Sequence, residues 1–192
     1  MPPKAKFTRN EVVAAALNIV ERDGIDRLTA RSLGRELGCS ARPIFTVFSG
    51  MDEVVQVVFE RANAIYGHYV EEGLKEDIAF KGVGKSYIRF ATEHGKLFQL
   101  LFMKERSVEY DLNDVLVGIE DHYEDILESI ESAYEVKRNI AKELYFHLWV
   151  YSHGIAVLIA TNMCRFTQEQ VSRQISEVFI SLLRKFKSEH VL

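Results

Sequence analysis

The chain has 192 residues, of which 47% are hydrophobic and 27% charged, an ordinary composition for a globular protein of one large or two small domains. Its only prolines are at positions 2, 3 and 43, so almost all of the chain is free to be helical. The net charge of −4 argues against a general nucleic-acid binder, but residues 1–50 hold eight Lys or Arg and five Asp or Glu, whereas residues 51–192 hold sixteen and twenty-three. The basic excess, +3 against −7, therefore lies at the amino end.

The first predicted helix begins after Thr8. Thr8 and Glu11, three residues later, form the pattern of a capping box, in which each side chain accepts a hydrogen bond from the other residue's backbone N–H. Asp23-Gly24 predicts the end of this helix, because glycine adopts conformations that interrupt one. Residues 1–6 are predicted to form a loose basic arm. This opening lacks the apolar run of a secretory signal, so we expect a cytoplasmic protein.

Residues 29–48, TARSLGRELGCSARPIFTVF, predict two short helices joined by a tight turn. Leu33 lies on the apolar stripe of the first helix, and Gly34 beside it lets another segment cross closely. Gly38 offers the left-handed conformation that ends a helix. Ser40 is expected to cap the helix that follows.

That second helix is predicted over about two turns, from Ala41 to Phe48. Its apolar positions are expected to face inward: Ile44, Phe45 and Phe48. Arg42 and Thr46 then face outward. A helix-turn-helix places in the major groove of DNA a helix of this kind, which follows a glycine turn, packs its apolar face on the core and exposes its polar face. The same pattern also suits an ordinary αα-hairpin, and this alternative stays open on these residues alone.

A long helix is predicted from about residue 50 to residue 74. Its apolar stripe runs for about four turns, which is too long to be covered by the amino-terminal helices alone. We therefore expect this helix to connect them to a second domain.

Further helices are predicted over the acidic part of the chain, at about 79–93, 96–104, 113–134 and 137–162, and one that opens at Thr167 with a second capping box. The fold is thus expected to be all-α, with about nine helices. Polar side chains interrupt the uncharged run from 144 to 164, so a buried helix is predicted there and no membrane span. Surplus apolar surface on the last two helices predicts a homodimer with a four-helix interface.

The sequence holds no pattern that indicates catalysis, a metal or a cofactor. The two cysteines, Cys39 and Cys164, are not spaced as zinc ligands or as a disulfide framework, and both are expected to be buried. The six histidines show no metal-binding motif, and no nucleophile or phosphate-binding motif occurs. We predict no enzyme activity, no metal and no cofactor.

Aromatic side chains beyond residue 50 are candidates for the wall of a small-molecule pocket, where rings supply contact and polar tips supply orientation. The candidates are Tyr69, Phe90, Phe98, Phe102, Tyr123, Trp149 and His153. Each of them also fits an ordinary core position, and this alternative stays open.

Residues 8–55 resemble the DNA-binding domain of the tetracycline-repressor (TetR) family of bacterial transcriptional regulators. The matching features are the helix from Thr8, Asp23-Gly24, Leu28-Thr29, Glu36-Leu37-Gly38-Cys39-Ser40, the aromatic pair Phe45 and Phe48, and Asp52-Glu53-Val54. Three positions depart from the family at residues that commonly contact phosphate: Phe45, Val47 and Met51. Residues 90–102, FATEHGKLFQLLF, and 149–154, WVYSHG, are similar to the ligand domain of a branch of this family with a Trp…His-Gly motif.

The resemblance implies a DNA-binding domain over residues 1–50 and a ligand-binding and dimerisation domain over residues 51–192. It implies a transcriptional repressor that binds a palindromic operator in double-stranded DNA as a homodimer and responds to a small-molecule effector. The DNA-contact candidates are Thr29, Arg31, Ser40, Ala41, Arg42, Phe45 and Thr46, with Arg42 as the reader of guanine. The alternative is a ligand-binding or protein-interaction module of the same fold with weak or lost DNA binding, because of the three departures.

Overall fold

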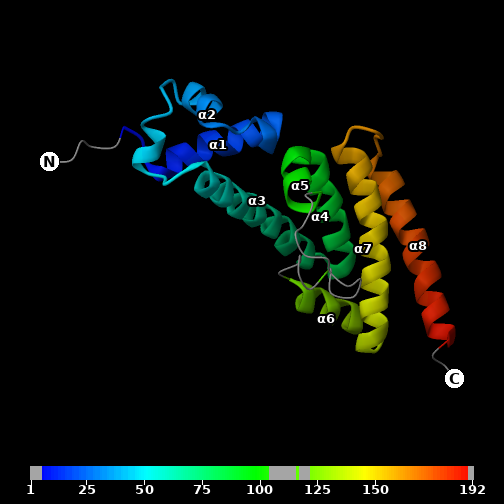
Figure 1. The fold of residues 1–192 in the computed structure, drawn as a ribbon. Helices are drawn as coiled ribbons and strands as arrows, with labels where there is room; N and C mark the ends of the chain where they lie inside the picture. Colours follow the sequence, from blue (N-terminus) through cyan, green and yellow to red (C-terminus); the bar gives the residue numbers. More distant parts are fainter. Residues whose placement is uncertain (1–5, 104–115, 117–121, 190–192) are drawn as a thin grey trace. The chain divides into compact units, whose positions relative to one another are not determined.

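The computed structural model describes residues 6–103, 116 and 122–189. Over these residues it contains eight α-helices, two short 3-10 turns and no strand, which confirms the predicted all-α class (Figure 1). The helices are α1 (Arg9–Asp23), α2 (Ala30–Glu36), α3 (Met51–Leu74), α4 (Ala79–Glu93), α5 (Gly95–Phe102), α6 (Tyr123–Tyr134), α7 (Arg138–Ala160) and α8 (Gln168–Glu189). The 3-10 turns are η1 (Ile25–Arg27) and η2 (Ile44–Thr46).

The starts of α1 and α8 follow local sequence signals. At α1, the backbone N–H of Thr8 donates to Glu11 Oε2 at 2.7 Å, and that of Glu11 donates to Thr8 Oγ1 at 3.3 Å. Before α8, the backbone N–H of Thr167 donates to Gln170 Oε1 at 2.8 Å, and that of Gln170 donates to Thr167 Oγ1 at 3.1 Å. Both predicted capping boxes are confirmed.

The described residues form two compact units, one within Met1–Ile65 and His94–Lys104, the other within Tyr66–Glu93 and Glu105–Leu192. We call them unit 1 and unit 2. Helix α3 contributes its first part to unit 1 and its remainder to unit 2. The functional division into residues 1–50 and 51–192 stays a prediction.

Unit 1 is built on α1, which packs against α2, η1 and α5. Its core includes fully buried side chains from five elements: Val12, Ile19, Leu33, Ile44, Val58 and Phe98. The close approach predicted at Gly34 is confirmed, because a Cβ atom there would lie 2.9 Å from the carbonyl oxygen of Cys39. Gly38 has a φ of +64°, which confirms the left-handed turn after α2.

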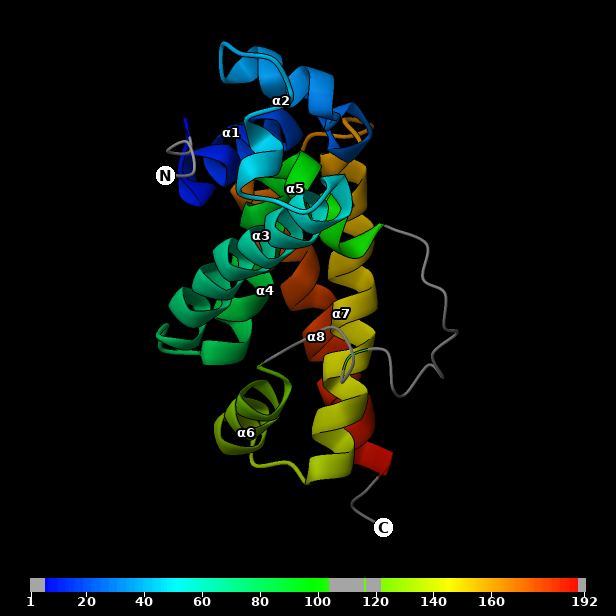
Figure 2. The same ribbon diagram turned by 60° about the vertical axis from the view of Figure 1, so that its left-hand side comes forward.

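Unit 2 is built on α7, which packs against α4, α6 and α8. Helices α7 and α8 lie side by side along their length, and α6 lies beside the first turns of α7 (Figures 1 and 2). Helices α3 and α4 meet at two glycines, where a Cβ atom on Gly82 would lie 2.1 Å from the carbonyl oxygen of Gly73. Only a residue without a side chain permits this contact between two backbones.

The prediction of an α-helix from Ala41 to Phe48 is wrong, because this segment contains only the 3-10 turn η2. Thr46 Oγ1 donates to the carbonyl oxygen of Pro43 at 2.6 Å, and the N–H of Val47 donates to the carbonyl of Ile44. The Thr46 hydroxyl therefore bonds the Pro43 carbonyl oxygen, which in an α-helix would accept the backbone N–H of Val47. Three β-branched residues in a segment this short also weaken helix nucleation.

Other local predictions need correction. Phe45 was expected to face inward, but 44% of its surface is exposed, because the 3-10 turn directs only Ile44 and Phe48 into the core. Ser40 caps no helix, since the turn that follows begins at Pro43 without a side-chain cap. Cys164 is exposed in the connection between α7 and α8, so its predicted burial is also wrong.

Some predictions fall on residues that the structure does not describe. Residues 1–5 of the predicted basic arm lie outside the described residues, and so do residues 113–115 and 117–121 of the helix predicted over 113–134. The described end of that helix is α6.

Candidate functional site

The turn before α2 is held by a hydrogen-bond network around Thr29. The backbone N–H of Thr29 donates to Ser32 Oγ at 2.9 Å, and that of Ser32 donates to Thr29 Oγ1 at 3.1 Å. Ser32 Oγ also donates to the carbonyl oxygen of Arg27 at 2.7 Å. Thr29 is exposed, so its hydroxyl lies at the surface in a position set by the cap.

Exposed arginines surround this turn and line α2. Arg22 is paired with Glu36 at 3.3 Å and with Asp23 at 3.0 Å. The hydrogen bond to Glu36, followed by that to Asp23, raises the pKa of Arg22. Four others have no carboxylate partner within the described residues: Arg27, Arg31, Arg35 and Arg42. Asp23, Asp26 and Glu36 lie beside some of these arginines, but within the described residues none of the four forms an ion pair.

Two depressions flank α2, and Arg31 and Arg35 line both of them. Arg31 is a sequence candidate, whereas Arg35 was missed. Their spacing of four residues places both on one face of a helix, so helical periodicity could have found Arg35. Ser40 and Ala41 lie at the rim of the second depression.

The segment after the glycine turn presents its polar side chains to solvent. Arg42, Phe45 and Thr46 are exposed, and Ala41 is half-buried. Ile44 and Phe48 anchor the segment from beneath, with 0% and 4% of their surfaces exposed. All seven sequence candidates for DNA contact, from Thr29 to Thr46, thus lie on α2 or on the two turns that flank it.

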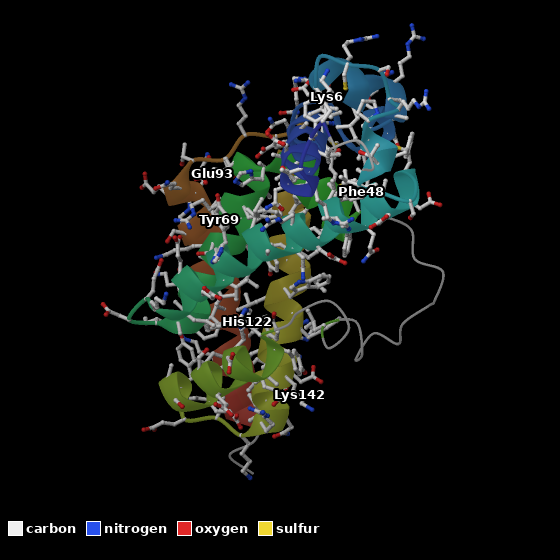
Figure 3. The ribbon with its side chains drawn as sticks, turned by 90° about the vertical axis from the view of Figure 1, so that its left-hand side faces the viewer. Lys6, Phe48, Tyr69, Glu93, His122 and Lys142 are labelled. Carbon is white, nitrogen blue, oxygen red and sulfur yellow. The ribbon has the colours of Figure 1, made fainter. Side chains whose placement is uncertain are left out.

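Arg9 of α1 holds the far end of this segment. Its Nη1 atom lies 2.6 Å from Glu53 Oε1 and donates to the carbonyl oxygen of Val47 at 3.1 Å. Its guanidinium carbon lies 4.2 Å from the ring centre of Phe48, which is labelled in Figure 3. Sequence analysis missed this contact, because Arg9 is 38 and 44 residues from its two hydrogen-bond partners.

Glu53 also caps the start of α3. Its Oε2 atom accepts the backbone N–H of Ser49 at 2.7 Å and the hydroxyl of Ser49 at 2.8 Å. The hydrogen bond from the Ser49 backbone, followed by that from Arg9, lowers the pKa of Glu53 from 4.5 to about 2. Glu53 is therefore ionised over the whole physiological pH range.

Unit 2 contains a cavity that is partly open to solvent. Side chains from α3, α4, α6, α7 and α8 line it: Tyr66, Phe80, Lys81, Val83, Gly84, Tyr87, Tyr134, Tyr145, Leu148, Trp149, Ser152, Ile175, Ser176 and Phe179.

Two of the sequence candidates for an effector pocket lie at this cavity. Trp149 lines it, and His153 stacks on Trp149 with ring centres 4.9 Å apart and planes inclined by 14°. His153 Nδ1 is hydrogen-bonded to the hydroxyl of Tyr87, itself a lining residue, at 2.8 Å. Burial lowers the pKa of His153, so the imidazole is neutral near pH 7.

Three further candidates lie elsewhere in unit 2. Phe90 is fully buried in the core, and Tyr123 is half-buried with its ring 5.9 Å from that of Tyr145. The hydroxyl of Tyr69 donates to the carboxylate of Glu93. Both residues are labelled in Figure 3. Burial, followed by this hydrogen bond, raises the pKa of Tyr69 to about 12.

The last two candidates, Phe98 and Phe102, belong to unit 1. Both lie on α5, with ring centres 5.1 Å apart. Sequence analysis missed most of the observed cavity wall, including Phe80, Tyr145 and Phe179. These residues lie on three different helices, so only the packing of α4, α7 and α8 brings them together.

Helices α7 and α8 expose large apolar side chains. Val150 is 48% exposed and Ile180 is 45% exposed. In the described part of the chain, no helix is long and apolar enough to cross a membrane. Within the same residues, no three His, Cys, Asp or Glu side chains gather in a way that could hold a metal ion.

No protein-family model matches the chain, and no curated protein is significantly similar to it in sequence. Among solved structures, the fold is similar to that of a TetR-like transcriptional regulator from Rhodococcus sp. RHA1. The TM-score is 0.64, and the match covers 98% of this chain and 99% of that one. The chain has the TetR-like fold. At 11% sequence identity the likeness is one of fold alone, and the Trp…His-Gly branch stays a prediction.

Proposed function

We propose that this TetR-like chain is a DNA-binding transcriptional regulator that acts as a repressor, without a catalytic reaction of its own. The observation that carries the proposal is the exposed arginine surface of α2 and its flanking turns, backed by the buried side chains of Leu33, Ile44 and Phe48. Exposed arginines that form no ion pair within the described residues suit the phosphate backbone of DNA.

Each side chain of this surface has a distinct role in the proposal. Thr29, Arg31 and Arg35 contact phosphates, together with backbone N–H groups near Ser40. Arg42 reads guanine through its paired N–H donors. The ring of Phe45 is exposed and packs against a thymine methyl group, an apolar contact to a base edge.

We further propose that the regulator is a homodimer formed through α7 and α8. Val150 and Ile180 supply exposed apolar surface on these helices, which a second copy of the chain would cover. Two copies related by a twofold axis would offer their arginine surfaces to half-sites about one helical turn apart, 34–36 Å. A small molecule in the cavity of unit 2 would release DNA if it favoured a dimer with another spacing.

Selection from a random DNA library, followed by gel shift with the full chain at about 0.15 M salt, tests the proposal. We expect a defined palindrome. The substitution Arg42→Ala should cost about 1–3 kcal/mol and relax the preference at one base pair of each half-site. Arg61→Ala is the control, since Arg61 is an exposed arginine of α3 away from the proposed surface.

Weak binding to all sequences that disappears with salt would refute the repressor. It would favour the alternative of a ligand-binding or protein-interaction module. A uniform loss on every sequence with Arg42→Ala would reassign Arg42 to a phosphate contact.

A further inference from the structure

The cavity of unit 2 has an aromatic wall and a single charged group. Seven of its fourteen lining residues are aromatic, and the remainder are aliphatic, small or hydroxyl-bearing apart from Lys81. Lys81 has no carboxylate partner among the described residues, and no carboxylate of those residues lines the cavity. The fixed charge at this cavity is therefore positive and not neutralised by the protein.

This composition favours an anionic ligand with an apolar body over two other broad classes. A cationic molecule would meet Lys81 without any carboxylate to pair with its charge. A sugar or another molecule rich in hydroxyls would bring polar groups against rings, and one of the hydroxyls of the wall, that of Tyr87, is already bonded to His153. Rings bind best to other flat, apolar groups.

We propose that the cavity binds a small aromatic monocarboxylate, with its ring among the aromatic side chains and its carboxylate at Lys81. The inference rests on the proposed function, which assigns this cavity to a small-molecule effector. Lys81 is exposed, so it lies where the cavity meets solvent. The apolar end of the ligand enters first and the charged end stays at the mouth.

Gly84 makes this proposal testable without damage to the fold. It lines the cavity on α4, and a Cβ atom there would meet nothing within 4 Å. The space next to Gly84 is thus available to a ligand, and a leucine at this position would fill part of it. Because leucine favours a helix interior more than glycine does, Gly84→Leu should leave α4 intact.

Trp149 provides the signal for the test, because it is the single tryptophan of the chain and lines the cavity. Three probes share one skeleton and differ in charge: 4-phenylbutanoate, 4-phenylbutanamide and 4-phenylbutylamine. Each is titrated into the full chain without DNA, and binding is followed by Trp149 fluorescence. We expect the carboxylate to bind most tightly and the amine most weakly.

The variants assign this preference to named residues. Lys81→Gln should lower the ratio of carboxylate to amide affinity by about two- to fivefold, the effect of one exposed ion pair. Gly84→Leu should weaken the binding of all three probes, and Gly84→Ala should weaken their binding less. The controls are Lys142→Gln, an exposed lysine of α7 that does not line the cavity, and Gly67→Leu, a helical glycine of α3 with open space beside it.

The inference is overturned if the amine binds as tightly as the carboxylate, if Lys81→Gln leaves the ratio unchanged, or if Gly84→Leu binds all probes as before. The failure of the proposed function gives a different result. Then the carboxylate still binds with the expected variant effects, but the chain selects no palindrome from the DNA library. A chain that selects a palindrome but binds none of the probes refutes only the ligand class.

Discussion

The contact between α3 and α4 gives the sharpest test of the packing in unit 2. In the variant Gly82→Ala, the new Cβ atom would lie 2.1 Å from the carbonyl oxygen of Gly73 and 2.9 Å from the Cβ of Glu76. The first of these neighbours is backbone, so the helices themselves must separate. Overpacking of this kind costs about 1–3 kcal/mol, and alanine returns about 1 kcal/mol through its better helix propensity.

Taking the upper end of the packing cost, because the obstacle is backbone, we expect a net loss of about 2 kcal/mol. For a chain of this size such a loss lowers Tm by about 4–8 °C. Thermal unfolding followed by Trp149 fluorescence measures it, because Trp149 lies in unit 2. Circular dichroism of the same sample reports both units together.

Gly84→Ala is the matched control, two residues further along the same helix. Its Cβ atom meets nothing within 4 Å, so the helix-propensity gain of up to about 1 kcal/mol is left without a packing cost. We expect Tm to rise in this variant and to fall in Gly82→Ala. Equal Tm values for Gly82→Ala and the unchanged chain, or equal losses in both variants, would refute the close contact of α3 and α4.

Three further predictions concern ionisation and assembly. The lowered pKa of Glu53 means that its ionised form stabilises the fold at pH values above about 4.5 and that this contribution is lost as the pH falls through about 2. In urea unfolding, Glu53→Gln should lower the free energy of unfolding by a constant amount from about pH 5 to 8 and by less at lower pH. A loss of unfolding free energy that grows in acid would contradict the role of Glu53. The pKa of Tyr69 is raised to about 12, so its neutral form stabilises the fold below pH 10 and this contribution is lost as the pH rises through about 12. Burial also raises the pKa values of Tyr123 and Tyr134, so absorbance at alkaline pH should show several late-titrating tyrosines, and Tyr69→Phe should remove one of them. Ile180→Asp together with Val150→Asp should convert a dimer to a monomer in analytical ultracentrifugation, whereas a monomeric unchanged chain would refute the proposed interface.

Local features of this chain could be predicted from neighbouring residues alone. Thr8 with Glu11 and Thr167 with Gln170 set the starts of two helices, and Gly38 set the turn after α2, because each acts on backbone groups within four residues. The bounds of α4, Ala79–Glu93, agree with the helix predicted at about 79–93.

Contacts between distant residues were decided only by tertiary packing. The burial of Ile44 and Phe48 in the core of unit 1 holds the segment after Gly38 as a 3-10 turn, although its sequence periodicity predicted an α-helix. The clamp from Arg9 to Glu53 joins residues 44 positions apart.

The cavity of unit 2 shows the same division between local and tertiary information. Its wall combines residues of five helices, so periodicity could indicate that aromatic residues such as Trp149 face inward but not which of them surround one space. Phe98 and Phe102 have the same pattern and lie in the other unit. A sequence repeat reports which side of a helix is apolar, whereas a cavity depends on which helices then meet, and that is decided by the packing of the whole unit.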